Sequence, residues 1–171
     1  MSSISESAYM GVPNYDLFVS DTYEGLTFRD KTLSEWESIV EFGTLDETMD
    51  SHDLKAYNYS YMEKTMIIMN NLAYAKSSLK ACEMHYEVQV SHAKIKFVNE
   101  YKEKHSSSRL PSAEIINNIV NNSCAESYVA KNLAEIFLAF WQSQYDKVKI
   151  IDSRLSGLGY LIGIESKNSH N

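Results

Sequence analysis

The sequence predicts an all-α protein, built from long antiparallel helices that pack through coiled-coil seams and assemble into an oligomer. Glycine and proline, the residues that most often interrupt helices, are absent between Gly43 and Pro111 and again between Pro111 and Gly157. Over both stretches the apolar residues recur at helical spacing. Proteins of this kind usually work through surfaces and assembly rather than through a buried catalytic pocket.

Residues 1–50 are expected to form an acidic, irregular N-terminal segment with one short helix. Residues 1–53 carry 12 acidic side chains against two basic ones, whereas residues 54–171 carry 14 basic against 11 acidic. Scattered aromatic residues suggest that the segment docks somewhere: Tyr9, Tyr15, Phe18, Tyr23 and Phe28. The segment could instead be a solvated extension, and both interpretations stay open. Thr32 and Glu35 form a capping box, which predicts a helix over about 33–42 that stops at Gly43.

Residues 51–163 are expected to form one helical domain. Its first long helix should start near Ser51 or Asp53, which are good N-caps, and end around His105. Its apolar positions are Met62, Met66, Met69, Leu72, Ala75, Leu79, Cys82, Tyr86, Ala93, Phe97 and Tyr101. From Ile68 the steps alternate between four and three residues, which is typical of a coiled-coil seam.

A short helix should follow Pro111 and break near Asn121 and Asn122, before a last long helix. That last helix carries an apolar stripe, which we expect to serve oligomerisation: Leu133, Phe137, Phe140, Gln144, Val148, Ile151 and Leu155. Gln144, the one polar member, could fix the register or be a core amide. Gly157, Gly159 and Gly163 are expected to end the helix, leaving residues 164–171 as a polar tail.

The sequence gives no positive support for an enzyme, a metal site or a cofactor. His85, Glu87 and His92 lack a third ligand at suitable spacing, so they are interpreted as helix-surface residues. The glycine-rich stretch from Gly157 closes a helix, whereas a dinucleotide-binding loop opens one. Cys82 and Cys124 are expected to be reduced thiols. With no signal peptide and no membrane span, the chain is expected to be a soluble, cytoplasmic protein.

Basic residues gather in the second half of the first long helix. The members are Lys76, Lys80, Lys94, Lys96, Lys102, Lys104 and Arg109, and Phe97 and Tyr101 are interleaved with them. Lysines contact phosphates and aromatic rings stack on bases, so this combination suits single-stranded nucleic acid. The alternative is a solvated helix face, with Glu100 and Glu103 as partners and the aromatics in the core. On composition alone the alternative is favoured.

A local pattern in residues 50–160 resembles the UvsY-type recombination mediators of tailed phages. The resemblance is carried by Leu72-Ala73-Tyr74, by Leu79-Lys80-Ala81-Cys82-Glu83, by the stretch 90–97, by Asn99-Glu100-Tyr101, and by Phe140-Trp141 and Arg154-Leu155. In that family a Lys-x-Arg pair, followed by an apolar residue and a tyrosine, is linked to single-stranded DNA binding. The matching residues are Lys94 and Lys96, then Phe97 and Tyr101. Lysine replaces arginine at one position, which keeps the charge but loses the planar fork.

The resemblance implies a non-enzymatic mediator in the host cell cytoplasm. Such a protein would form a ring-like homo-oligomer, hold single-stranded DNA, and help a RecA-like recombinase load onto strand covered by a single-strand-binding protein. Two other classes stay open: an acidic DNA-mimic inhibitor or interaction protein, favoured by the net charge of −7, and a coiled-coil adaptor. DNA binding requires the lysines to share one surface, whereas mimicry requires ordered rows of carboxylates.

Overall fold

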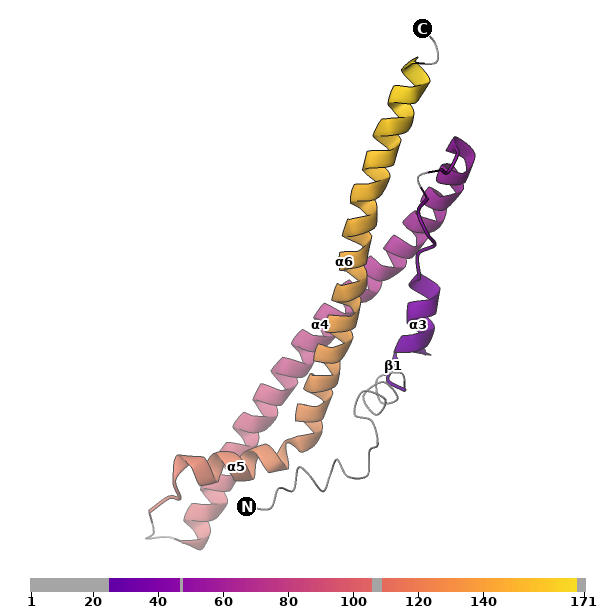
Figure 1. Cartoon of the computed structure of the whole chain (residues 1–171). Helices are drawn as coiled ribbons and strands as arrows, with labels where there is room; N and C mark the ends of the chain where they lie inside the picture. The colour runs from indigo at the N-terminus through magenta and orange to yellow at the C-terminus, as the bar shows by residue number, and fades with distance from the viewer. Residues whose placement is uncertain (1–24, 47, 106–108, 169–171) are drawn as a thin grey trace, which may run out of the picture. The chain divides into compact units, whose positions relative to one another are not determined.

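The protein is all-α, as the sequence predicts. The computed structural model describes residues 25–46, 48–105 and 109–168, with side chains up to residue 160 (Figure 1). Within that part there is a hairpin of β1 (Thr27–Phe28) and β2 (Lys31–Thr32), followed by α3 (Leu33–Val40), α4 (Ser51–Lys104), α5 (Ala113–Ser123) and α6 (Ala125–Asn168). Over these residues none of the helices combines the length and the apolar character needed to span a bilayer.

The chain divides into two compact units. The first is Met1–Ile67 with Asp152–Asn171, and the second is Ile68–Ile151, so that both long helices contribute to both units. The boundary expected at residue 50 therefore falls inside the first unit. Four of the five aromatic residues expected to dock lie in residues 1–24, outside the described part; the fifth, Phe28, is buried.

In the first unit, residues 27–32 form a hairpin where irregular chain was expected, and the predicted short helix follows as α3. Phe28 pairs with Lys31 across a turn in which Arg29 has a positive φ of 61°. The predicted capping box is present: Thr32 Oγ1 accepts from the Glu35 N–H, and the Glu35 carboxylate accepts from the Thr32 N–H. The hydrogen bond from the Thr32 N–H, and after it the bond that the Thr32 hydroxyl donates to the same carboxylate at 3.0 Å, lower the pKa of Glu35. Trp36 Nε1 donates to the Phe28 carbonyl at 2.9 Å, which ties α3 to the hairpin.

The segment after α3 is fastened to the start of α4. Tyr57 donates its hydroxyl to the Gly43 carbonyl at 3.2 Å, and Lys64 donates to the Glu41 carbonyl. The Phe42 and Tyr61 rings lie 5.7 Å apart, and burial raises the pKa of Tyr61. Helix α3 ends at Val40, two residues before the predicted end, because Glu41 already has extended backbone angles.

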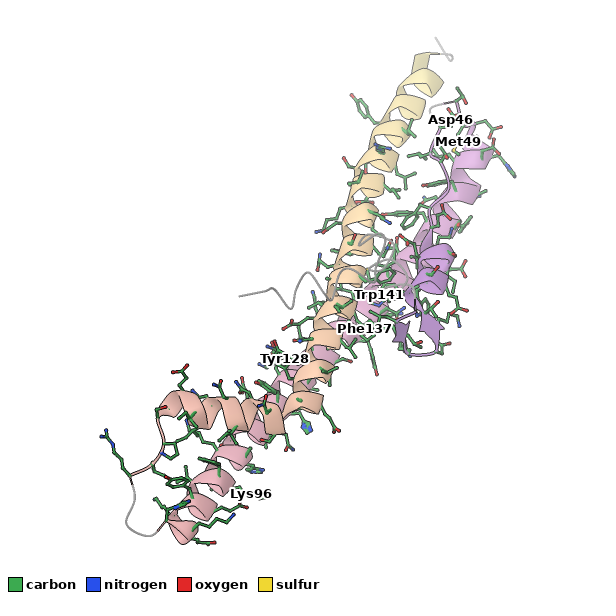
Figure 2. The ribbon with its side chains drawn as sticks, turned by 60° about the horizontal axis from the view of Figure 1, so that its bottom comes forward. Asp46, Met49, Lys96, Tyr128, Phe137 and Trp141 are labelled. Carbon is green, nitrogen blue, oxygen red and sulfur yellow. The ribbon has the colours of Figure 1, made fainter. Side chains whose placement is uncertain are left out.

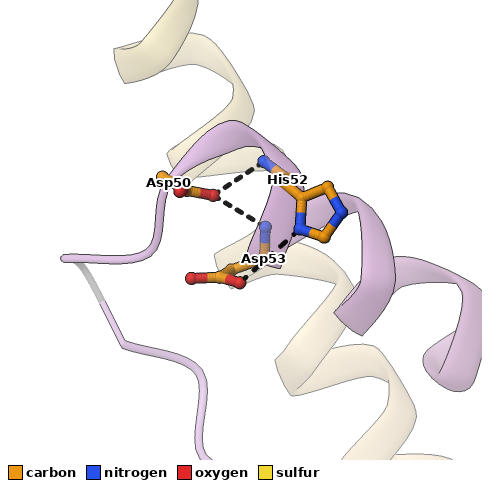
Figure 3. A group of neighbouring side chains, drawn as sticks. All are labelled: Asp50, His52 and Asp53. Carbon is orange, nitrogen blue, oxygen red and sulfur yellow. Dashed lines mark hydrogen bonds and ion pairs between the residues drawn. The ribbon is translucent and has the colours of Figure 1, made fainter.

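The cap of α4 is Asp50, one residue before Ser51 and three before Asp53, the two positions predicted for it. Asp50 Oδ1 accepts hydrogen bonds from the backbone N–H groups of His52 and Asp53, both at 2.8 Å (Figure 3). A carboxylate at this position satisfies two of the N–H groups that a helix start leaves without intrahelical partners.

In the second unit, α5 packs across α4. Ile116, Val120 and Cys124 form a buried cluster. Side chains of one face of α4 cover it: Tyr86, Val90, Ala93 and Phe97. Helix α5 continues through Asn121 and Asn122 and ends where the Cys124 N–H turns back to the Val120 and Asn121 carbonyls. Helix α6 then begins at Ala125 and lies beside α4, with the Tyr86 and Tyr128 rings 5.7 Å apart (Figures 1 and 2).

Three of the apolar positions expected in the first long helix, all of them methionines, do not lie on its buried side. Met62, Met66 and Met69 are exposed, whereas Ile68, Leu72 and Ala75 are buried. The four-three alternation that starts at Ile68 leads back along the helix to Thr65 and Tyr61, and Tyr61 is buried. The methionines therefore lie off the seam.

The prediction that glycines end the last helix is also wrong. Helix α6 runs through Gly157, Gly159 and Gly163 to Asn168, so most of the expected tail is helical. Glycine ends a helix when it adopts a positive φ, and no glycine does so within the described residues. In a helical conformation each glycine costs only about 1 kcal/mol relative to alanine.

Candidate nucleic-acid interface

The basic residues predicted to bind DNA are all on the surface. Figure 2 labels Lys96, which lies on the part of α4 that packs against α5. The exposed members at this end of the unit are Lys94, Lys96, Lys102, Lys104 and Arg109, which we call the basic hairpin end. Between Lys94 and Arg109 the only acidic residues are Glu100 and Glu103. The basic hairpin end is therefore locally positive in a chain that is acidic overall.

Tyr101 fastens the backbone of Arg109 to the end of α4. The Tyr101 hydroxyl donates to the Arg109 carbonyl at 3.4 Å, across the connection between α4 and α5. The Tyr101 ring lies 4.6 Å from the His105 ring and 6.0 Å from the Phe97 ring. Tyr101 thus has a structural role in closing the hairpin, and it remains partly exposed.

Phe97 belongs to the packing of the helices. Its half-buried ring contacts the cluster of Ile116, Val120 and Cys124. For this residue the alternative interpretation, that the aromatic is part of the core, agrees with the structure. A base could stack on the ring only where α5 leaves it uncovered.

Lys94 and Lys96 lie on opposite flanks of α4. Two residues along an α-helix correspond to a rotation of about 200°, so a strand that follows one of these lysines does not follow the other. Tyr101 comes seven residues after Lys94 and therefore lies on the Lys94 flank. Lys96 instead lines a groove of about 500 Å³ between α4 and α5, together with Gln89, His92 and Ile119.

Lys76 and Lys80 share the Lys94 flank but lie apart from the basic hairpin end. Helical geometry puts the three lysines within about 40° of one another around α4, yet Lys80 is about 21 Å from Lys94 along the axis. Glu83 and Glu87 occupy the same flank between them, and Glu83 pairs with Lys80 at 3.4 Å. Lys76 and Lys80 therefore do not extend the basic hairpin end as an unbroken positive surface.

The ion pairs at these lysines are weak. Lys96 lies 3.9 Å from the Glu100 carboxylate, and its side chain is 78% exposed. Surface pairs of this kind contribute roughly 0–1 kcal/mol, so they do not prevent a phosphate from taking the place of the carboxylate.

The apolar stripe assigned to oligomerisation is largely covered within a single chain. Phe140, Gln144 and Val148 are buried. The other members are half-buried: Leu133, Phe137, Ile151 and Leu155. Trp141 (labelled in Figure 2), which the stripe omits, is fully buried. Its ring lies edge to face with that of Phe140, with the ring centres 5.0 Å apart. The burial of this position could have been predicted from the tryptophan itself, a large apolar side chain in an otherwise charged, amphipathic helix.

Acidic and histidine side chains offer one other group to consider. Among the described residues, Asp50, His52 and Asp53 form the only group of three positioned to share a cation (Figure 3). All three are exposed, and the Asp50 carboxylate already accepts hydrogen bonds from backbone N–H groups at the start of α4. The group is therefore a helix cap. The structure does not bring His85, Glu87 and His92 together as a set of metal ligands within its described part.

No family model matches the chain, and the searches of curated proteins and of solved structures gave no significant match. The resemblance to the phage recombination mediators therefore rests on the residues quoted for it.

Proposed function

We propose that this chain is a non-enzymatic single-stranded DNA-binding protein that mediates phage recombination and repair. It would help a RecA-like recombinase load onto DNA that a single-strand-binding protein covers. The observation that carries the proposal is the basic hairpin end, where five basic residues are exposed and the Tyr101 hydroxyl donates to the Arg109 carbonyl across the connection between α4 and α5. Lysine and arginine supply phosphate contacts, and a partly exposed ring supplies stacking.

The net charge of −7 does not argue against this site, because the acidic residues are concentrated elsewhere. Residues 1–53 hold 12 of the 23 acidic side chains. Charges beyond a Debye length of about 8 Å are screened at physiological salt, so a local positive surface can still bind phosphate. Repetition of a weak site in a ring-like homo-oligomer would raise the avidity further.

The proposal includes self-association, but through a surface on α4 instead of the α6 stripe that the sequence suggested. Because α6 buries most of its stripe within the chain, the exposed apolar side chains of α4 are better candidates for contacts between copies. Tyr59, Met62 and Met66 follow one another at steps of three and four residues, and all three are exposed. A second helix could pack along such a series.

The decisive experiment is fluorescence anisotropy of a labelled single-stranded oligonucleotide at several salt concentrations. We expect salt-sensitive binding that Lys94→Ala with Lys96→Ala weakens, and a fall of up to about 1.4 in the slope of log affinity against log salt for two lost phosphate contacts. The matched control is Lys131→Ala with Lys149→Ala, which removes the same charge from α6 and should leave the slope unchanged.

The two single variants locate the strand. If the strand follows the Lys94 and Tyr101 flank, Lys94→Ala should account for most of the loss and Lys96→Ala for little of it. Absence of binding at low salt, from protein that circular dichroism shows to be folded, would reject the proposal. That outcome would favour the acidic protein-interaction or DNA-mimic alternative.

A further inference from the structure

Helix α4 carries a second heptad seam on its surface, in addition to the buried seam that starts at Ile68. Its members alternate between steps of three and four residues: Ala81, Met84, Val88, Ser91, Ile95 and Val98. All of them lie in the second unit, over about 26 Å of the helix. Met84, Val88 and Ile95 are 57%, 50% and 57% exposed. We call the six residues the outer seam.

The outer seam faces away from α5. Val88 comes two positions before Val90, and Ile95 comes two positions before Phe97; both of the later residues pack against the α5 cluster. Two positions correspond to about 200° around a helix. Helix α5 therefore cannot cover the outer seam while it covers the other face of α4.

The spacing of the outer seam fits another helix. Steps of three and four in strict alternation give the heptad period that keeps a row of side chains against a second helix along its whole length. A nucleic-acid strand makes no use of this period. A lipid surface binds a broad apolar face, whereas the outer seam is a single row with small residues at Ala81 and Ser91.

The charges beside the outer seam disfavour a partner helix of one sign. Lys80, Glu87 and Lys94 follow one another at seven-residue intervals along one flank. Glu83 also lies on this flank and pairs with Lys80 at 3.4 Å. The flank therefore holds two positive and two negative side chains. A wholly acidic or wholly basic helix would meet like charges on it, whereas a helix with the same mixture in reverse order would not.

A second copy of this chain in parallel orientation does not fit the outer seam. Equivalent residues face each other in a parallel pair, so Ala81 would face Ala81 and Ser91 would face Ser91, which leaves gaps beside the larger side chains. The charged flank would then meet the opposite flank, where His85 and His92 offer no carboxylate.

A second copy in antiparallel orientation does fit. A two-fold axis beside residues 89 and 90 places each member of the outer seam opposite a different one: Ala81 opposite Val98, Met84 opposite Ile95, and Val88 opposite Ser91 of the other copy. The two smallest members each face a larger side chain, as close packing requires.

The charges select this register among the antiparallel ones. The two-fold axis sets each flank against the same flank of the other copy, so Glu87 of each copy faces Lys94 of the other. Sliding the copies by seven residues towards the start of α4 would bring Lys80 to Lys94 and Glu87 to Glu87, which is repulsive. Sliding by fourteen residues restores opposite charges between Lys80 and Glu87 but places Ile95 opposite the polar Asn70.

We propose that two copies of this chain pair in antiparallel orientation through the outer seam, with Glu87 of each copy facing Lys94 of the other. The pairing extends the self-association included in the proposed function, at a place on α4 separate from Tyr59, Met62 and Met66, and it does not rest on DNA binding. Because Lys94 also belongs to the basic hairpin end, pairing and DNA compete for it. The outer seam spans less than three heptads, so we expect a dissociation constant on the order of 10 µM and a monomer in dilute solution.

The test measures self-association of the full-length chain by sedimentation velocity, from about 1 µM to about 200 µM protein. Glu87→Lys and Lys94→Glu should each weaken pairing about tenfold, because each creates like-charge contacts on both sides of the two-fold axis. Glu87→Lys combined with Lys94→Glu restores the opposite charges and should bring the affinity back to within about threefold of the unchanged chain. Glu135→Lys on α6 is the matched control and should leave the affinity unchanged.

A second variant tests the apolar part of the contact. Val88→Ser with Ile95→Ser should weaken pairing at least about tenfold. Serine has nearly the same helix propensity as valine and isoleucine, so α4 should stay intact, which circular dichroism checks. Single-stranded DNA binding should not weaken in this variant. The pairing and the proposed DNA binding can therefore fail independently of each other.

Three results would overturn the proposal. A monomer over the whole concentration range would leave the outer seam to a helix of another protein. Self-association that the serine variant leaves unchanged would place the contact between copies elsewhere on the chain. A combined charge variant that pairs no more tightly than Glu87→Lys alone would exclude the pairing of Glu87 with Lys94, because in the register slid by fourteen residues Lys94 faces no charged side chain.

Discussion

Val88 and Val90 are both valines and lie two positions apart in α4, yet their surroundings differ. Val90 packs against Ile116, Val120 and Cys124 of the α5 cluster. Val88 is half exposed on the opposite side of α4. Both valines have the same intrinsic helix propensity and the same apolar surface to bury, so neither local property separates them.

The difference comes from the covering element alone. Helix α5 is 11 residues long and buries only two of its own side chains, Ile116 and Val120. It covers one face of α4 and leaves the other to solvent or to a partner. An apolar stripe in this helix therefore shows that a surface exists, and tertiary packing decides whether the surface stabilises the fold or remains available for binding. Substitutions on the two faces should separate these roles.

The largest loss in the free energy of unfolding should come from shortening a side chain of α5, the helix that covers one face of α4. Ile116→Ala deletes a buried side chain from the α5 cluster and leaves a cavity, which should lower the free energy of unfolding by about 2–4 kcal/mol. Urea denaturation followed by circular dichroism measures this, at one fixed protein concentration because self-association would add to stability. A loss below about 1 kcal/mol would mean that α5 does not pack on α4 in solution.

The next effect should come from the covered valine. Val90→Ala removes two methyl groups that contact the cluster, at a cost of about 1 kcal/mol in the free energy of unfolding. Part of the cost is offset because alanine is the better helix former. The same urea titration checks this value. An unchanged midpoint would show that the contact between Val90 and α5 contributes nothing, and the comparison with Val88 would lose its basis.

The parts of the fold that the sequence predicted well are those fixed by neighbouring residues. Thr32 and Glu35 lie three positions apart, and their capping box formed as expected. The absence of glycine and proline after Gly43 correctly indicated α4, and the seam from Ile68 correctly indicated Leu72 and Ala75 as buried.

The sequence did not predict which apolar side of each long helix is buried, because segments distant in the sequence decide this. Met62, Met66 and Met69 are apolar at helical spacing, but their side of α4 is exposed. Sequence alone gave no sign of which of two apolar sides another segment would cover. The stripe from Leu133 to Leu155 was correctly recognised as apolar, yet the chain itself covers most of it.

The candidate site could be predicted only as a set of basic residues. Sequence identified Lys94, Lys96 and Arg109, and the two-residue spacing on a helix already puts the two lysines on opposite flanks. The structure adds that the Tyr101 hydroxyl donates to the Arg109 carbonyl. That bond joins residues across the connection between α4 and α5, whose path no local pattern specifies. The sequence suggested that Phe97 stacks on bases, because its contact with α5 is likewise a tertiary feature that spacing does not reveal.

The smallest effect, and the one whose sign matters most, should come from the exposed valine. Val88→Ala removes the same two methyl groups as Val90→Ala, but here they are half exposed and contact no described part of the cluster. Little apolar burial is lost, while alanine improves helix propensity by up to about 0.6 kcal/mol. The free energy of unfolding should therefore stay unchanged or rise slightly in the same urea titration. A loss as large as that of Val90→Ala would mean that the Val88 side of α4 is already covered in the free protein, and a dependence of that loss on protein concentration would identify another copy as the cover.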